Sequence, residues 1–202
     1  AARALAHFDL VRLFAKPYNF TADASHLGVP VITTPQSEIR FPTRNSVKEV
    51  YDQIIADFTK AITLLNVPKK GGYFTPDAAK ALLAKVYLYK GDWANAELYA
   101  TQVISSGNHT LLTRAQYVNS WGGDYSSESL FEIENVPTDR PGVNGIGFFY
   151  EQTAYGDALA TADLYNTYTE TDVRRELIQV GTRANAENPA YIVHKYPKGL
   201  TS

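Results

Sequence analysis

The sequence predicts a mainly α-helical fold, in which paired helices form a bundle interrupted by long loops and a few short strands. Apolar residues recur at helical spacing between residues 47 and 65, which predicts one long helix. Two further stretches with this spacing lie between residues 75 and 107 and are joined by a Gly-Asp turn, which predicts a helical hairpin. Beyond residue 108 the helical period gives way to segments rich in proline, glycine and aromatic residues, which predicts the loops.

The chain opens on a predicted helix that ends near Lys16, because Pro17 disfavours helical geometry in the residue before it. Residues 17–45 contain four prolines and no sustained period, so we expect a long ordered connection, with a short extended piece at residues 29–33. The apolar residues expected on one broad face of the opening helix are Leu5, Phe8, Leu10, Leu13 and Phe14.

The helix predicted after Ser46 has the clearest pattern in the chain. Ser46 and Glu49 form a capping box, in which each side chain binds a backbone N–H of the first turn. Pro68 and the glycines at positions 71 and 72 are expected to end the helix. Its apolar stripe comprises Val47, Val50, Tyr51, Ile54, Ile55, Phe58, Ala61, Ile62 and Leu65.

The hairpin begins at Thr75, which caps a helix with Pro76 at its first position, and its second helix ends at Gly107. Trp93 follows the turn and is expected to pack there as a wedge. The expected stripes are Ala79, Leu82, Leu83, Val86 and Tyr87 in the first helix, and Ala94, Ala96, Leu98, Tyr99, Ala100, Val103 and Ile104 in the second. The residues that fall at the offsets of the tetratricopeptide pattern are Leu83, Ala84, Tyr87, Gly91, Asp92, Ala96, Ala100 and Val103.

The second half of the chain is predicted to contain short elements between loops. Residues 129–136 alternate as a strand does, with Phe131 and Ile133 on the inner face. Helical pieces are expected near residues 160–167 and 172–180, and one strand is expected close to the end of the chain.

Composition excludes several function classes. The 202 residues carry 19 Lys and Arg against 21 Asp and Glu, so the chain lacks the basic surface that nucleic acid requires. The absence of cysteine excludes disulfides, thiolate nucleophiles and sulfur-bound metals, and the four histidines share no metal-ligand spacing. No apolar run reaches the ~20 residues of a membrane-spanning helix. Because methionine is absent and the chain opens within a helix, we expect a piece of a longer protein.

Several segments resemble the SusD/RagB family, in the same order and over nearly the whole chain. They are LGVPVIT at residues 27–33, RNSVKEVYDQIIAD at 44–57, AAKALLAKVYLYKGDWANAELYATQVISSG at 78–107, SESLFEI at 127–133 and DLYNTYTETDVRRE at 163–176. Ala15 stands where the family often has glycine, a departure that affects a turn rather than function.

The resemblance implies a non-catalytic lipoprotein on the extracellular face of the Bacteroidetes outer membrane, with its lipid anchor outside this chain. Such a protein captures an oligosaccharide or another nutrient and delivers it to a SusC-like TonB-dependent transporter. It requires no cofactor. Residues 1–202 would be the central part of a single SusD-like domain, with the helical repeats at about 1–107 and the loop-rich ligand side at about 108–202.

Carbohydrate binders stack sugar rings on exposed aromatic side chains and bind the hydroxyls with polar ones. Aromatic residues that lie beside glycines, outside any core periodicity, are therefore candidates for contacting a ligand. These are Trp121, Tyr125, Phe148, Phe149 and Tyr150, and the candidate hydroxyl partners are Asn135, Asp139, Arg140 and Asn144.

Two other functions remain open from the sequence. Glu132 and Glu134 would lie on one face of the predicted strand, about 7 Å apart, a spacing that glycoside hydrolases use. They are also explained as solvent-facing strand residues, so we predict no catalytic residue. A tetratricopeptide scaffold that binds a protein segment would need three or more contiguous repeats, and only one complete repeat can be recognised in the sequence.

Overall fold

The computed structural model describes residues 1–35, 37–38, 41–67, 72–133, 138, 142–184 and 186–196. The chain divides into two compact units. The helical unit comprises Ala1–His109 with Leu130–Glu132, and the loop-rich unit comprises Thr110–Ser129 with Ile133–Ser202. No helix among the described residues is long and apolar enough to cross a membrane.

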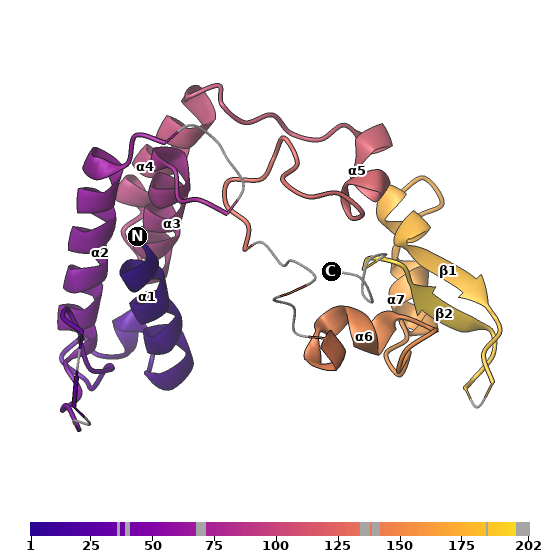
Figure 1. The fold of residues 1–202 in the computed structure, drawn as a ribbon, viewed down its shortest axis with the longest axis horizontal. Helices are drawn as coiled ribbons and strands as arrows, with labels where there is room; N and C mark the ends of the chain where they lie inside the picture. Colours follow the sequence, from indigo (N-terminus) through magenta and orange to yellow (C-terminus); the bar gives the residue numbers. More distant parts are fainter. Residues whose placement is uncertain are drawn as a thin grey trace. The chain divides into compact units, whose positions relative to one another are not determined.

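Four helices build the helical unit: α1 (Ala2–Phe14), α2 (Val47–Leu64), α3 (Pro76–Lys90) and α4 (Trp93–Ser105). Figure 1 shows them side by side, and each packs mainly on the next along the chain, α1 on α2, α2 on α3 and α3 on α4. A short 3₁₀ turn, η1 (Tyr18–Phe20), follows α1. This arrangement confirms the predicted bundle of paired helices.

The predicted helix ends are present. The backbone N–H of Glu49 donates to Ser46 Oγ at 3.2 Å and the Glu49 carboxylate accepts from the backbone N–H of Ser46 at 2.8 Å, which completes the capping box. Thr75 Oγ1 accepts from the backbone N–H of Ala78 at 3.1 Å. Gly91 ends α3 with a φ of +81°, a left-handed conformation that costs glycine little.

The core of this unit lies where α1, α2 and α3 meet. Its largest side chains are less than 2% exposed and come from all three helices: Phe8, Val11, Val47, Val50, Ile54, Phe58, Leu83 and Val86. The predicted stripe of α2 is thus largely confirmed, because these residues repeat along the face that α1 and α3 cover.

The expected apolar faces of α1 and α4 are partly wrong. In α1 the buried residues are Ala4, His7, Phe8 and Val11, while Leu10, Leu13 and Phe14 are exposed. At about 100° per residue, Leu10 lies roughly 200° around the helix from Phe8, so both cannot face α2. In α4 the exposed apolar residues are Trp93, Ala94, Leu98, Ala100 and Ile104.

No residue of helix α4 is fully buried, because α3 is its main neighbour in this unit. Tyr99 stacks on Tyr87 of α3, with ring centroids 5.7 Å apart and planes 8° from parallel. Trp93 is 67% exposed, so the expected wedge beside the turn is wrong.

One arginine fastens the long connection between α1 and α2. The guanidinium of Arg44 donates to the backbone carbonyls of Phe14 and Leu27, each at 3.1 Å, and of Gly28 at 2.5 Å. Backbone bonds between Gly28 or Val29 and Asn45 close the same loop. No strand forms at residues 29–33, where a short extended piece was expected.

We expect the Arg3–Asp57 ion pair between α1 and α2 to make stability depend on pH. Arg3 binds Asp57 in two-pronged fashion, Nε to Oδ2 at 2.7 Å and Nη2 to Oδ1 at 2.5 Å. These bonds lower the pKa of the Asp57 carboxyl, although partial burial opposes the shift. Because the folded pKa lies below the unfolded one, the contribution is present above the unfolded pKa and is lost as pH falls through the folded pKa.

The measurement is urea unfolding between pH 7 and pH 3. Asp57→Asn should lower the free energy of unfolding at pH 7 and flatten its decline toward acid. Asp52→Asn, in an ion pair with Lys48 whose side chains are both more than half exposed, is the control and should change the profile little. If the free energy of unfolding of Asp57→Asn declined toward acid as steeply as that of the unmodified protein, the role of the Arg3–Asp57 pair would be contradicted.

The loop-rich unit contains short elements: α5 (Arg114–Ser120), η2 (Gly142–Asn144), α6 (Ile146–Tyr150), α7 (Ala162–Thr167), η3 (Val173–Leu177), β1 (Ile178–Gly181) and β2 (Ala190–Val193). Strands β1 and β2 form an antiparallel pair in which Ile178 lies opposite Val193 and Gly181 opposite Ala190. The backbone N–H of Ala160 donates to the carbonyl of Tyr191 and so joins the segment before α7 to this hairpin. Figure 1 shows the hairpin in yellow.

Several expectations for the second half need correction. Residues 129–133 form no strand, and residues 134–136 lie outside the described part of the chain. Phe131 instead stacks on Phe74, with ring centroids 4.2 Å apart, and Ile133 is 76% exposed. An alternating pattern forms a strand only where a partner backbone is available to hydrogen-bond it.

The other elements of this unit are partly as expected. Residues 160–167 contain α7 and the final strand is β2, whereas the helix expected at 172–180 is one 3₁₀ turn followed by β1. Helix α5 was missed, although Gln116 accepts from the backbone N–H of Thr113 at 3.0 Å in a capping-box pattern that the sequence carries.

Candidate functional site

A cluster of aromatic rings forms where the chain folds back after α6. The ring of Tyr155 lies 5.5 Å from that of Phe148 and 5.9 Å from that of Phe149, between centroids. Phe149 is 44% exposed and Tyr155 is 47% exposed. Each therefore packs against a neighbouring ring and still presents part of its surface to solvent.

The turn after α6 depends on Gly156. Its φ of +55° suits glycine, and a Cβ at this position would lie 3.2 Å from the Cα of Gln152. The backbone N–H of Ala158 donates to the carbonyl of Phe149 at 3.0 Å, which returns the chain to α6. The turn thereby carries Tyr155 onto the two phenylalanines.

The side chain of Arg183, in the connection between β1 and β2, binds the backbone of the same turn. Its guanidinium donates to the backbone carbonyl of Gly156 and, at 3.1 Å, to that of Tyr155. Its Nη2 also lies 3.7 Å from the carboxylate of Asp157, which is 75% exposed. Arg183 therefore fixes the position of Tyr155 without using a ring contact.

A second pair of contacts involves Trp121 and Tyr150. Lys195 Nζ lies 4.1 Å from the centroid of the Trp121 ring, a cation–π contact, and Tyr196 stacks on Tyr150 with ring centroids 5.2 Å apart. Because Lys195 and Tyr196 are consecutive, one short segment contacts two predicted site residues that are distant in sequence.

The predicted residues have different surroundings. Phe148 and Tyr150 are partly buried, as are Trp121 and Tyr125, whereas Phe149 and Asn144 are exposed. Asn135, Asp139 and Arg140 lie outside the described residues, as does Glu134, so its separation from Glu132 is not described. Within the described ranges no group of three or more His, Cys, Asp or Glu side chains is arranged to hold a metal ion.

Sequence reasoning missed Tyr155, Arg183, Lys195 and Tyr196. Tyr155 stands next to Gly156 and follows the aromatic run at 148–150, so the aromatic-beside-glycine signal that selected Trp121 could have found it. Arg183 has no such local signal, because its contacts are to backbone carbonyls 27 and 28 residues earlier.

The arrangement suits a ligand with a flat apolar face and many hydroxyls. Half-exposed rings offer C–H stacking surface, and the exposed Asp157 and Asn144 could bind hydroxyls. A sugar ring has both properties.

Comparisons with known proteins find similarity to SusD-like proteins. A SusD-like family model, described as starch-binding and associating with the outer membrane, matches residues 1–88. A SusD-like protein of Bacteroides ovatus is 28% identical over a stretch that covers 67% of this chain and 25% of the relative.

Solved structures agree over a longer span. A SusD superfamily protein from Bacteroides vulgatus is 30% identical with a TM-score of 0.81, and the match covers 96% of this chain and 45% of that one. Another, from Bacteroides thetaiotaomicron, is 29% identical with a TM-score of 0.83, over 98% of this chain and 48% of that one. The chain thus spans less than half the length of the relatives it matches. In both sequence and fold, the chain is therefore similar to SusD-like proteins.

Proposed function

We propose that this protein binds an oligosaccharide or another nutrient at the extracellular face of the outer membrane and delivers it, uncleaved, to a SusC-like TonB-dependent transporter. The observation that carries the proposal is the half-exposed Phe149–Tyr155 ring pair in a chain similar to SusD-like proteins. The description of the matching family model, starch-binding and associating with the outer membrane, supports both the ligand class and the location.

The aromatic residues of the candidate site have two roles in this proposal. Phe149 and Tyr155 stack on the ligand, because their rings are the most exposed of the cluster. Phe148 and Tyr150 support them from α6, while Trp121 and Tyr125 stay predictions as ligand contacts. Asn144, Asn135, Asp139 and Arg140 stay predictions as hydroxyl partners.

We expect Tyr155→Ala to weaken oligosaccharide binding by roughly tenfold, since removing one stacking ring costs on the order of 1.5 kcal/mol. Isothermal titration of the intact protein with maltooligosaccharides and a wider glycan panel measures the change. Tyr73→Ala is the matched control, because Tyr73 is 56% exposed but lies in the helical unit. Equal losses in both variants, or no glycan binding by the unmodified protein, would refute the site.

Two further measurements separate the proposal from its alternatives. Incubation of bound oligosaccharide with the protein should give no shorter products, whereas a glycosidase would release them. Co-purification should recover a TonB-dependent transporter rather than a peptide ligand. The scaffold alternative is disfavoured because the described helices α1–α4 form only two pairs, fewer than the three repeats that a solenoid needs.

A further inference from the structure

The helical unit contains a pocket that the proposed function does not use. It lies at the end of α1, where Val11, Arg12, Ala15 and Lys16 face η1, α2 and α3; the remaining lining residues are Pro17, Tyr18, Tyr51 and Tyr89. Its volume is about 140 Å³. An engineered protein cavity of about 150 Å³ holds one benzene ring, so this pocket has room for a ligand of single-ring size.

The charged side chains that line the pocket are both cations. They are Arg12 and Lys16, and no lining residue carries a carboxylate. Asp9, which pairs with Nη2 of Arg12 from one turn earlier on α1, is not among the lining residues. Arg12 is therefore held in place while the pocket itself has no anion.

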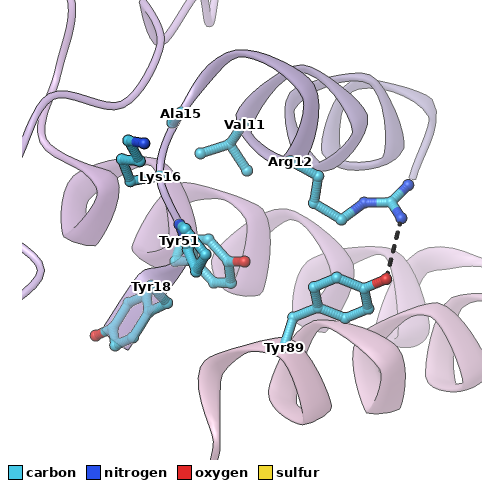
Figure 2. A pocket seen from close by; sticks show the side chains of 8 residues that line it. Val11, Arg12, Ala15, Lys16, Tyr18, Tyr51 and Tyr89 are labelled. Carbon is cyan, nitrogen blue, oxygen red and sulfur yellow. Dashed lines mark hydrogen bonds between the residues drawn. The ribbon is translucent and has the colours of Figure 1, made fainter. Parts of the chain in front are cut away.

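The tyrosine hydroxyls make the pocket rich in hydrogen-bond donors. Tyr89 accepts from Arg12 Nη1 at 3.5 Å, so its own proton remains to be donated (Figure 2). Tyr51 is 3% exposed, and its side chain lines the same pocket. Figure 2 shows its oxygen directed toward the side of the pocket that Arg12 and Tyr89 form.

Burial keeps this donor protonated. Desolvation raises the pKa of Tyr51 to about 12, while the charge of Arg12 opposes the shift. The Nε of Arg12 is buried and has no hydrogen-bond partner among the described residues. Unsatisfied buried donors cost free energy, and a bound acceptor would recover part of that cost.

We propose that this pocket binds the carboxylate of an organic acid of single-ring size, with Tyr51, Tyr89 and Arg12 as its donors. The ring would pack on Val11 and on Tyr18, whose own ring lies 4.9 Å from that of Tyr51 between centroids. Lys16 adds positive charge at the rim. A sugar acid and an aromatic acid share this chemistry, and the pocket lies in the other unit from the Phe149–Tyr155 pair.

The test compares each acid with its neutral counterpart. Isothermal titration of the intact protein uses glucuronate against glucose and benzoate against benzyl alcohol. At least one acid should bind tenfold or more tightly than its counterpart, and the pair that shows this identifies the source of the carboxylate. Equal binding within both pairs, or no binding by either acid, would overturn the proposal.

Matched variants then localise the binding. Tyr51→Phe removes one hydroxyl and should weaken acid binding roughly tenfold, because hydrogen bonds to charged groups are among the strong ones. Tyr87→Phe removes a hydroxyl from α3 outside the pocket and should leave binding unchanged. Binding by Tyr51→Phe as tight as that of the unmodified protein would refute the assignment. Tyr155→Ala should leave acid binding intact, so failure here and failure of the proposed function are distinguishable.

Discussion

Replacing Phe58 with alanine should lower the free energy of unfolding by about 3–5 kcal/mol. Phe58 lies on α2 and is 0% exposed, in the core that α1 and α3 complete. The substitution removes the transfer free energy of a ring and leaves a cavity that the packed helices can close only in part. Urea unfolding followed by circular dichroism at 222 nm measures the loss.

Phe41→Ala is the control, because the same side chain is removed where it is 93% exposed. Its free energy of unfolding should change by no more than about 0.5 kcal/mol. Similar losses in the two variants would show that the buried position of Phe58 between the helices is wrong.

Gly28→Ala should destabilise the protein by about 1–3 kcal/mol, because the added methyl group has no room. A Cβ at this position would lie 3.0 Å from Val50 Cγ2 and 3.1 Å from both the carbonyl oxygen of Asn45 and the Cα of Val47. Two of these three atoms are backbone atoms near the start of α2 and cannot rotate away. The clash therefore moves either the loop or the helix.

Gly123→Ala tests whether the effect comes from crowding. Its Cβ would lie 3.7 Å from the carbonyl oxygen of Ser120, an ordinary contact. The substitution should leave stability unchanged or raise it by up to about 1 kcal/mol, because alanine restricts the unfolded chain. The melting temperature should fall in Gly28→Ala and should stay the same or rise in Gly123→Ala. An equal fall in both variants would contradict the close approach of backbone atoms at Gly28.

The helices that sequence reasoning located best are those whose ends have local chemical signals. The capping box at Ser46, the Thr75–Pro76 start and the Gly91 turn each act within a few residues, so a single stretch of sequence contains the whole cause. The exposed faces of α1 and α4 could not be predicted in the same way. Which stripe of a helix is buried depends on the neighbour it meets, and the sequence pattern of Leu10 and Leu13 does not contain that neighbour.

The residues of the candidate site also differ in whether a local sequence signal identifies them. Phe149 was found because aromatic residues beside glycine carry a local signal, and Tyr155 could have been found from the same signal. Arg183 and Lys195 could not, because their contacts join segments that only the folded chain brings together. Helix α6 was also missed, since five residues contain too little periodicity to distinguish a short helix from a loop.

The way in which Arg44 binds the α1–α2 connection determines which substitutions this connection tolerates. Its guanidinium binds carbonyl oxygens, which residues of every type possess, and not the side chains of Phe14, Leu27 or Gly28. Exposed side chains along that segment can therefore be exchanged for others while the route of the chain is kept.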